Sequence, residues 1–234
     1  PAILACGLLC RHGGTAVAEA LLGRYNPGGK TNGTWLKSAG QIPFNFPAKP
    51  KSNYEPELKN GSYNPGALWP FGFGLSYTTF EVGRPAVTPL TEPGEPTLWD
   101  RLLFREAAPR PAGWRVSFPV TNTGKVAGDE VVQLYVAYAK TPIYWFDQML
   151  RGFRRVHLAP GETKTVTLDV PLDHLKIVLE DQSWVLPDEP FELRLGSSSV
   201  HLRWRTLIKG GQVIRTEPVK PAKRPPENVN PLTA

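Results

Sequence analysis

The sequence has 234 residues, of which 41% are hydrophobic and 10% aromatic, which is enough for a packed core and argues against intrinsic disorder. Its 25 prolines and 22 glycines indicate many turns and few long helices, and no apolar run approaches the about 20 residues of a membrane span. Half of the net charge of +6 lies after Leu207 and the rest is interleaved, with no basic stripe on a helix. We therefore expect no nucleic-acid partner.

The first ten residues are apolar but carry neither an initiator Met nor the basic start of a signal peptide, so we interpret them as internal to a longer chain. Cys6 and Cys10 are the only cysteines, and His12 adds just one further metal ligand. Buried free thiols are the better interpretation of the two cysteines. We expect neither a metal site nor a cofactor.

Residues 15–22 are the best helix candidate, because Thr15 can cap its start and Gly23 can close it. A Pro-Gly-Gly turn follows, and residues 31–68 hold short extended pieces, such as 41–46, among loops. One helix with scattered strands cannot bury a core alone, so this part needs a partner. The apolar face expected on the helix consists of Val17, Ala20 and Leu21.

Residues 81–113 contain six prolines and are predicted to be a connector without regular structure. Part of this connector is too apolar for a free linker, and we expect that part to pack on a neighbouring surface. Its apolar residues are Trp99, Leu102, Leu103 and Phe104.

From Trp114 the hydrophobic pattern has a period of two, which is typical of half-buried strands. About seven short strands with frequent turns predict an immunoglobulin-like sandwich over residues 114–206. The basic, proline-rich tail, 207–234, is expected to be extended over a surface or disordered.

Residues 69–80 join aromatic residues to glycines and end in a β-prone Ser-Tyr-Thr-Thr-Phe segment. This run resembles the end of the second domain of family 3 glycoside hydrolases, the β-glucosidase and β-xylosidase group. Further pieces resemble that family in the same order along the chain. They are residues 13–18, 23–30 and 40–43, then 120–124, 128–136, 150–153, 158–163 and 191–199. The departures are residues 6–12 and 31–35.

The resemblance implies a mostly β chain, in which the C-terminal part of an α/β sandwich domain (1–80) precedes a fibronectin type III-like β-sandwich. It also implies a retaining glycosidase of secreted or periplasmic location, acting on β-glucoside or β-xyloside oligosaccharides. In that family the nucleophile Asp and the acid/base Glu lie in earlier domains. We thus expect no catalytic residue in this chain, which alone is inactive without the missing N-terminal catalytic domains.

The acidic residues of the chain are interpreted as structural, because they open strands or occupy turns. The acidic pairs are Asp129 and Glu130, Glu180 and Asp181, and Asp188 and Glu189. His12, Tyr63 and Trp69 are candidates for contact with a sugar, and Phe73 for stacking on one. The alternative function is a non-catalytic sandwich module that binds carbohydrate or another protein.

Overall fold

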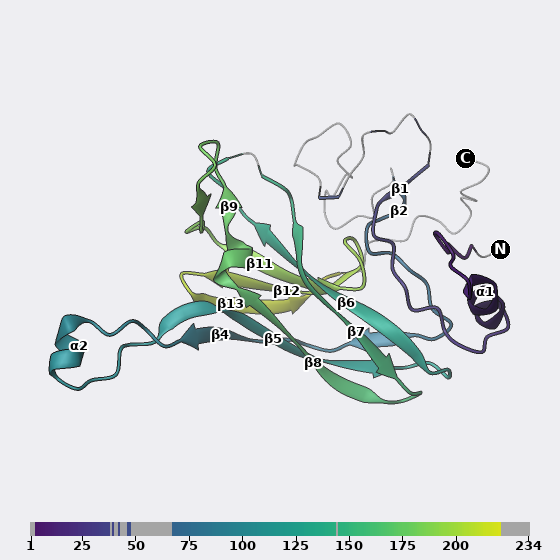
Figure 1. Cartoon of the computed structure of the whole chain (residues 1–234), viewed down its shortest axis with the longest axis horizontal. Helices are drawn as coiled ribbons and strands as arrows, with labels where there is room; N and C mark the ends of the chain where they lie inside the picture. Colours follow the sequence, from purple (N-terminus) through teal and green to yellow (C-terminus); the bar gives the residue numbers. More distant parts are fainter. Residues whose placement is uncertain are drawn as a thin grey trace.

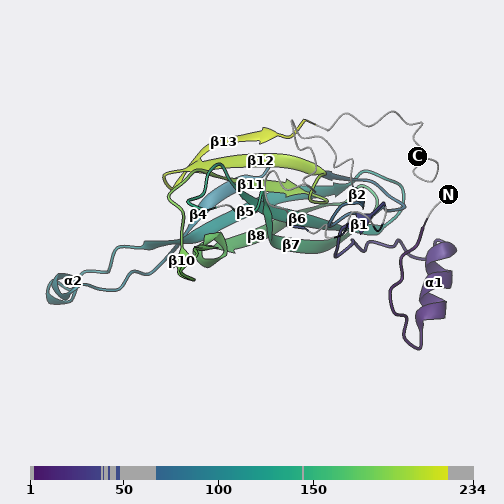
Figure 2. The same cartoon turned by 90° about the horizontal axis from the view of Figure 1, so that it is seen from above.

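The computed structural model describes residues 3–37, 39, 42, 46–47, 67–143 and 145–220. Its body is a sandwich of two antiparallel β-sheets (Figure 1). Helix α1 (Gly13–Leu21) lies at one end of the sandwich, and helix α2 (Leu98–Leu102) projects from the opposite end; Figure 2 shows the same separation from above.

The first sheet has five strands in the order β13-β12-β11-β6-β7, all paired antiparallel. Its strand β6, between β11 and β7, is buried along most of its length, since the second sheet covers one face and the N-terminal segment contacts the other. The strands are β6 (Gly128–Tyr138), β7 (Met149–Leu158), β11 (Phe191–Gly196), β12 (Leu202–Lys209) and β13 (Gln212–Pro218).

The second sheet is built around the long strand β5, which pairs with β8 on one edge and with β3 and β4 on the other. Its strands are β3 (Phe80–Val82), β4 (Ala86–Glu92), β5 (Arg110–Asn122) and β8 (Thr163–Pro171). The remaining elements are the pairs β1 (Trp35–Leu36) with β2 (Ala67–Trp69) and β9 (Ile177–Val178) with β10 (Trp184–Val185), and the 3₁₀ turn η2 (Leu172–Leu175).

The core confirms the predicted alternation. On β5, every second side chain from Trp114 to Val120 is at most 5% exposed. The same alternation buries Val166, Leu168 and Val170 on β8, and these side chains meet those of β6 and β11 between the sheets. The predicted mostly β sandwich is therefore confirmed.

The expectation that residues 81–113 lack regular structure is wrong. This stretch contains β4, α2 and the start of β5. Pro89 lies within β4 opposite Trp114, and it is tolerated because β4 pairs only with β5. An edge strand needs no hydrogen-bond donor on its outer side.

The expectation for the tail is also wrong where the structure describes it. Strand β13 pairs with β12 and places Pro218 opposite Trp204. β13 is the outer strand of its sheet, so proline again occupies an edge. Residues 221–234 lie outside the described residues.

Helix α1 begins earlier than predicted. His12 rather than Thr15 is its N-cap residue, and no side chain caps the helix there. The predicted stop at Gly23 is confirmed. Its φ of +69° fits a Schellman motif, in which Gly23 N donates to Ala20 O and Arg24 N donates to Glu19 O.

The two cysteines are not buried as expected. Both are free, with Cys6 half-buried and Cys10 exposed. The apolar face predicted for α1 is only partly covered, since Ala20 is buried while Leu21 is 69% exposed. Most of the extended piece predicted at 41–46 lies outside the described residues.

Candidate functional site at the junction of the N-terminal segment and the sandwich

The aromatic and glycine run of residues 69–80 turns sharply onto the sandwich. Phe73 N donates to Pro70 O at 3.1 Å, and Gly72 has a φ of +78°, as the third position of a type II turn requires. A Cβ atom on Gly72 would lie 2.0 Å from Oε1 of Gln133. Only glycine therefore satisfies both the turn and the close approach to β6.

Gln133 on β6 binds this turn to the first sheet. Its Nε2 donates to the carbonyl oxygens of Gly72, at 3.0 Å, and of Ser197, at 2.8 Å. Its Oε1 accepts from the hydroxyl of Tyr135, whose pKa is raised by burial. Ser199 N also donates to Phe71 O at 3.1 Å. The polar atoms of this buried glutamine are thus all satisfied, and its bond to Gly72, with that of Ser199 to Phe71, fixes the position of the run.

A buried ion pair joins the two parts beside this turn. Lys30 Nζ lies 2.8 Å from Oε1 of Glu130, and each side chain is 9% exposed. Lys30 also donates to Gly74 O at 3.2 Å, and Glu130 accepts from the backbone N of Val131 at 2.8 Å. Because both charges are removed from water, loss of either partner would leave an uncompensated buried charge.

Asn26 holds the end of the run. This residue is 7% exposed, its Nδ2 donates to Ser76 Oγ at 2.7 Å, and its Oδ1 accepts from Tyr77 N at 2.9 Å. The hydroxyl of Tyr77 donates to Ala20 O at 2.9 Å and so connects the run to α1. We call this set of contacts around Asn26, Lys30, Gly72 and Gln133 the junction.

The sugar-contact candidates that the structure describes belong to different elements. His12 is exposed at the start of α1, whereas Trp69 is half-buried in β2 and packs edge-on against Trp35, with ring centroids 5.1 Å apart. Phe73 lies 6.0 Å from the ring of His201. Tyr63 lies outside the described residues. Trp69 and Phe73 are therefore used for packing within the protein.

The pKa shifts of the described carboxylates all point away from a general acid, which requires a raised pKa. Hydrogen bonds from Thr97 lower the pKa of Asp100, and the hydrogen bond from Arg115 lowers that of Asp169. Burial of Asp129 works to raise its pKa, but hydrogen bonds from His157 and Arg155 outweigh burial. The pKa values of Glu162, Asp173 and Asp181 are also lowered, by hydrogen bonds that they accept from Ala159, Lys176 and Ser183 respectively.

The acidic pairs have the structural positions expected of them. Asp129 and Glu130 lie in β6, and Glu180 and Asp181 occupy the turn between β9 and β10, where Ser183 donates to Asp181. Asp188 and Glu189 lie in the loop before β11. Among the residues that the structure describes, no group of three His, Cys, Asp or Glu side chains could hold a metal ion.

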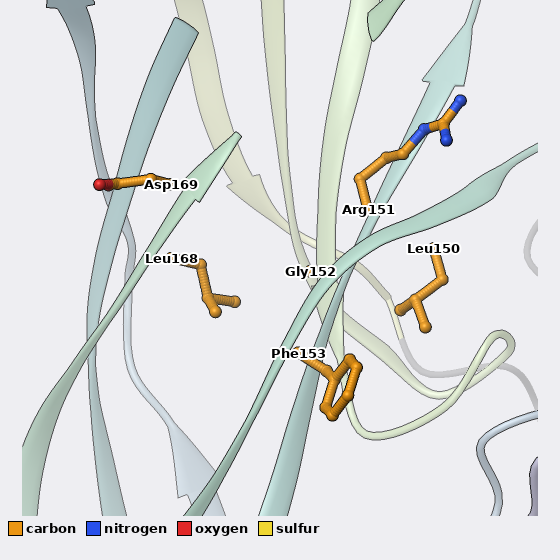
Figure 3. A pocket seen from close by; sticks show the side chains of 6 residues that line it. All are labelled: Leu150, Arg151, Gly152, Phe153, Leu168 and Asp169. Carbon is orange, nitrogen blue, oxygen red and sulfur yellow. The ribbon is translucent and has the colours of Figure 1, made fainter. Parts of the chain in front are cut away.

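An open groove with a largely apolar lining lies between the edges of the two sheets, and its Phe153 is the cross-strand neighbour of Gln133. Its volume is about 430 Å³, and it is lined by side chains of β7 and β8 (Figure 3). No helix in the described part of the chain is long and apolar enough to cross a membrane.

The sequence contained a signal for part of the junction. Gln133 interrupts an otherwise apolar stretch of β6, and a polar residue at such a position requires buried partners. The pairing of Lys30 with Glu130 had no comparable signal, because an ion pair between segments far apart in the sequence depends on the tertiary fold.

Two family models match the chain. The C-terminal domain of glycosyl hydrolase family 3 matches residues 1–77, and a fibronectin type III-like domain matches residues 130–199. The junction joins these two matched regions, since Lys30 and Gly72 belong to the first and Glu130 and Gln133 belong to the second.

Several named proteins resemble most of the chain. A β-xylosidase of Formosa agariphila is 37% identical over 188 residues, covering 80% of this chain and 24% of the relative. A periplasmic β-glucosidase of Salmonella typhimurium is 31% identical over 209 residues, covering 86% of this chain and 25% of the relative. The chain thus spans about a quarter of the length of these relatives.

Solved structures resemble the fold. A β-glucosidase involved in saponin metabolism from intestinal bacteria has a TM-score of 0.67 and 34% identity, covering 84% of this chain and 24% of the other. A β-D-glucoside glucohydrolase from Trichoderma reesei has a TM-score of 0.64 and 27% identity, covering 85% of this chain and 29% of the other.

Proposed function

Because the chain belongs to glycoside hydrolase family 3, whose C-terminal domain and fibronectin type III-like domain it carries, we propose that it is the C-terminal portion of a retaining β-glycosidase. The complete enzyme removes terminal β-linked glucose or xylose, the sugars named in its relatives. A retaining enzyme needs a nucleophile and an acid/base carboxyl group about 5–5.5 Å apart.

In this proposal both catalytic carboxyl groups come from preceding domains of the complete enzyme, and the chain alone is inactive. The lowered pKa values of Asp129, Asp169 and the other shifted carboxylates support this division, because each is held as the anion by a structural partner.

The role of the chain rests on one observation, the buried junction. The segment that matches the hydrolase domain is joined to the sandwich through the Lys30 and Glu130 pair and through Gln133. Leu21 and Leu22 remain 69% exposed on the other side of that segment. We assign these leucines to contact with the rest of the α/β domain, so the sandwich braces that domain through the junction.

The strand pairing supports wider limits for the brace than residues 114–206. β3 and β4 pair with β5, and β13 pairs with β12. We therefore place the sandwich unit from Phe80 to Pro218, with the arm of residues 93–109 as an insertion in it.

A chimera tests the proposal. This chain replaces the C-terminal quarter of the Formosa agariphila β-xylosidase, and hydrolysis of nitrophenyl β-xyloside and β-glucoside is measured. We expect turnover by the chimera and none by the chain alone, since absence of the acid and the nucleophile costs many orders of magnitude in rate. The truncated xylosidase keeps both carboxyl groups but lacks the end of its α/β domain and the sandwich that braces it, so we expect it to be inactive as well. Turnover by the isolated chain, or a monodisperse chimera as inactive as the truncated enzyme, contradicts the proposal.

A carbohydrate-binding module is the second candidate, and Trp184 favours it. This side chain is 65% exposed on the β9–β10 hairpin, where its ring is free to stack on a sugar. Titration of the chain with cello- and xylo-oligosaccharides by calorimetry decides the matter. Binding that is abolished by Trp184→Ala favours the module, and absence of heat favours the brace.

A further inference from the structure

The arm between β4 and β5, residues 93–109, carries an exposed apolar tip. Trp99 is 71% exposed and Phe104 is 98% exposed, and more than half of each neighbouring leucine is also exposed. The leucines of the tip are Leu98, Leu102 and Leu103. An apolar cluster of this size on a protein surface marks an interaction site rather than the scattered exposure of ordinary surfaces.

The tip is held in a defined shape. A capping box fixes the start of α2, in which Thr97 N donates to Asp100 Oδ2 at 2.9 Å and Asp100 N donates to Thr97 Oγ1 at 3.1 Å. Phe104 follows the helix with a φ of +50°, which is unfavourable for a residue with a side chain. The exposed ring therefore belongs to an ordered structure that is prepared for contact.

The arm points away from the part of the chain that matches the hydrolase domain. α1 and α2 lie at opposite ends of the sandwich in both views (Figures 1 and 2). The exposed leucines beside α1, where the rest of that domain is placed, lie at the end remote from the arm. The tip is thus accessible to a second molecule.

A receptor of matching character lies on the same chain, in the groove between β7 and β8. Its apolar lining consists of Leu150, Gly152, Phe153 and Leu168, and Phe153 is 65% exposed (Figure 3). The groove of about 430 Å³ is open, so a projecting side chain can enter it from solvent.

The groove also has an unsatisfied cationic wall. The register of β6 and β7 shifts between Leu134 and Tyr135, whose partners are Gly152 and Leu150, so Arg151 is the additional residue of a β-bulge. Among the described residues, Nε of Arg151 is buried without a hydrogen-bond partner, and desolvation lowers the pKa of this guanidinium.

From these features we propose that two copies of this chain form a two-fold symmetric dimer, in which the arm of each copy places its apolar tip in the β7–β8 groove of the other. Two-fold symmetry makes the contacts reciprocal, since a tip that reaches the partner's groove brings the partner's tip to its own groove. The ends that carry α1 then point outward, away from the contact.

The area of the aromatic side chains agrees with this arrangement. The arm carries charges of both signs, Glu95, Asp100 and Glu106 beside Arg101 and Arg105, and the groove is lined by one of each sign, Arg151 and Asp169, so charge neither favours nor opposes the contact. Two reciprocal contacts include four aromatic side chains from the tips. At about 150–250 Å² for each buried aromatic side chain, these rings alone account for much of the total area that a small specific interface needs.

Sedimentation velocity of the whole chain over a range of concentrations tests the proposal. The tip variant is Trp99→Ala with Phe104→Ala, the groove variant is Phe153→Ala, and Trp184→Ala is the control because it removes an equally exposed aromatic side chain elsewhere. We expect dimers of the unchanged chain and of the control, and a Kd raised by at least about 30-fold in each of the other two, as for a truncated hot-spot residue. All of these side chains are exposed, so circular dichroism should show an unchanged fold.

Mixing the two variants distinguishes this arrangement from direct packing of one tip on another. A mixture of the tip variant and the groove variant retains one intact tip and one intact groove, so we expect it to associate more tightly than either variant alone. A chain that stays monomeric at every concentration overturns the proposal. A groove variant that dimerises as the unchanged chain does, or a mixture no tighter than its components, also overturns it.

Discussion

The sandwich and the N-terminal segment differ in how they are stabilised. The sandwich buries its own apolar side chains between two sheets, with Phe118, Leu134 and Leu195 at most 1% exposed. The N-terminal segment leaves its leucines exposed and is bound to the sandwich by polar contacts, chiefly those of Lys30 and Asn26. One region is therefore a self-sufficient core, and the other is held in place for a further partner.

The largest effect is expected in the core. Phe118→Ala removes a ring that is 1% exposed, and the cavity together with the lost burial should reduce the free energy of unfolding by about 3–5 kcal/mol. Phe104→Ala is the matched control, because its ring is 98% exposed and its loss should change little. Urea denaturation at low protein concentration measures both. Equal midpoints for the two variants would contradict the assignment of the core.

A large effect is also expected at the junction. Lys30→Met leaves the carboxylate of Glu130 buried without its cation, which should cost about 3–5 kcal/mol. The double variant with Glu130→Met replaces both charges by apolar groups and should recover most of that loss. Loss of stability in the double variant equal to the sum of the two single losses would show that the two charges are not coupled.

The effect of pH should be smaller. The pKa of Asp129 is lowered below its ordinary value of 3.8, because the hydrogen bonds from His157 and Arg155 outweigh burial. The contribution of Asp129 to the free energy of unfolding is complete at pH values above its pKa in the unfolded chain. It is lost as the pH falls through the lower pKa that Asp129 has in the folded protein. Since Arg155 is 59% exposed, we expect about 0.2–1 kcal/mol. Asp129→Asn should flatten the dependence of stability on pH below 3.8, and an unchanged slope would exclude this residue as its source.

The smallest effect is expected on the open face of α1. Leu21→Ala changes a side chain that is 69% exposed, so the free energy of unfolding of this chain should change by less than about 0.5 kcal/mol. In the chimeric xylosidase the same substitution should be more costly, because there Leu21 contacts the rest of the domain. The change in unfolding temperature caused by Leu21→Ala is measured in this chain and in the chimera. Equal changes in the two proteins would contradict the inference that the rest of the α/β domain covers Leu21.

The sandwich could be predicted from the sequence because its core is encoded locally. The alternation of Trp114, Val116 and Phe118 with polar residues reports one buried face without any tertiary information. The prediction of irregular structure for residues 81–113 and for the tail was wrong because it was also based on local sequence alone. Pro89 and Pro218 indicate irregular structure when considered alone, but both lie in strands that pair on one side only.

The junction could be predicted only in outline. The glycine and aromatic residues of 69–80 signalled a constrained loop, and Gly72 fulfils that signal in its turn. The partners of this loop come from strands distant in the sequence, so neither Gln133 nor Glu130 could be assigned to it beforehand. The predicted burial of Cys6 and Cys10 failed because their segment is not covered by the rest of the described chain.

Native-state hydrogen exchange tests most directly whether the junction makes the two regions one structural unit. Three backbone amides of the junction are informative. Thr31 N donates to Phe73 O and Gly72 N donates to Thr31 O, each at 2.8 Å, and Ser199 N donates to Phe71 O. We predict that these amides exchange with a free energy close to that of the β6 core amides, and that Lys30→Met lowers the value for the junction amides alone. Rapid exchange of Thr31 and Gly72 in the unchanged chain, beside a protected sandwich, would show that the segment is not held by the junction.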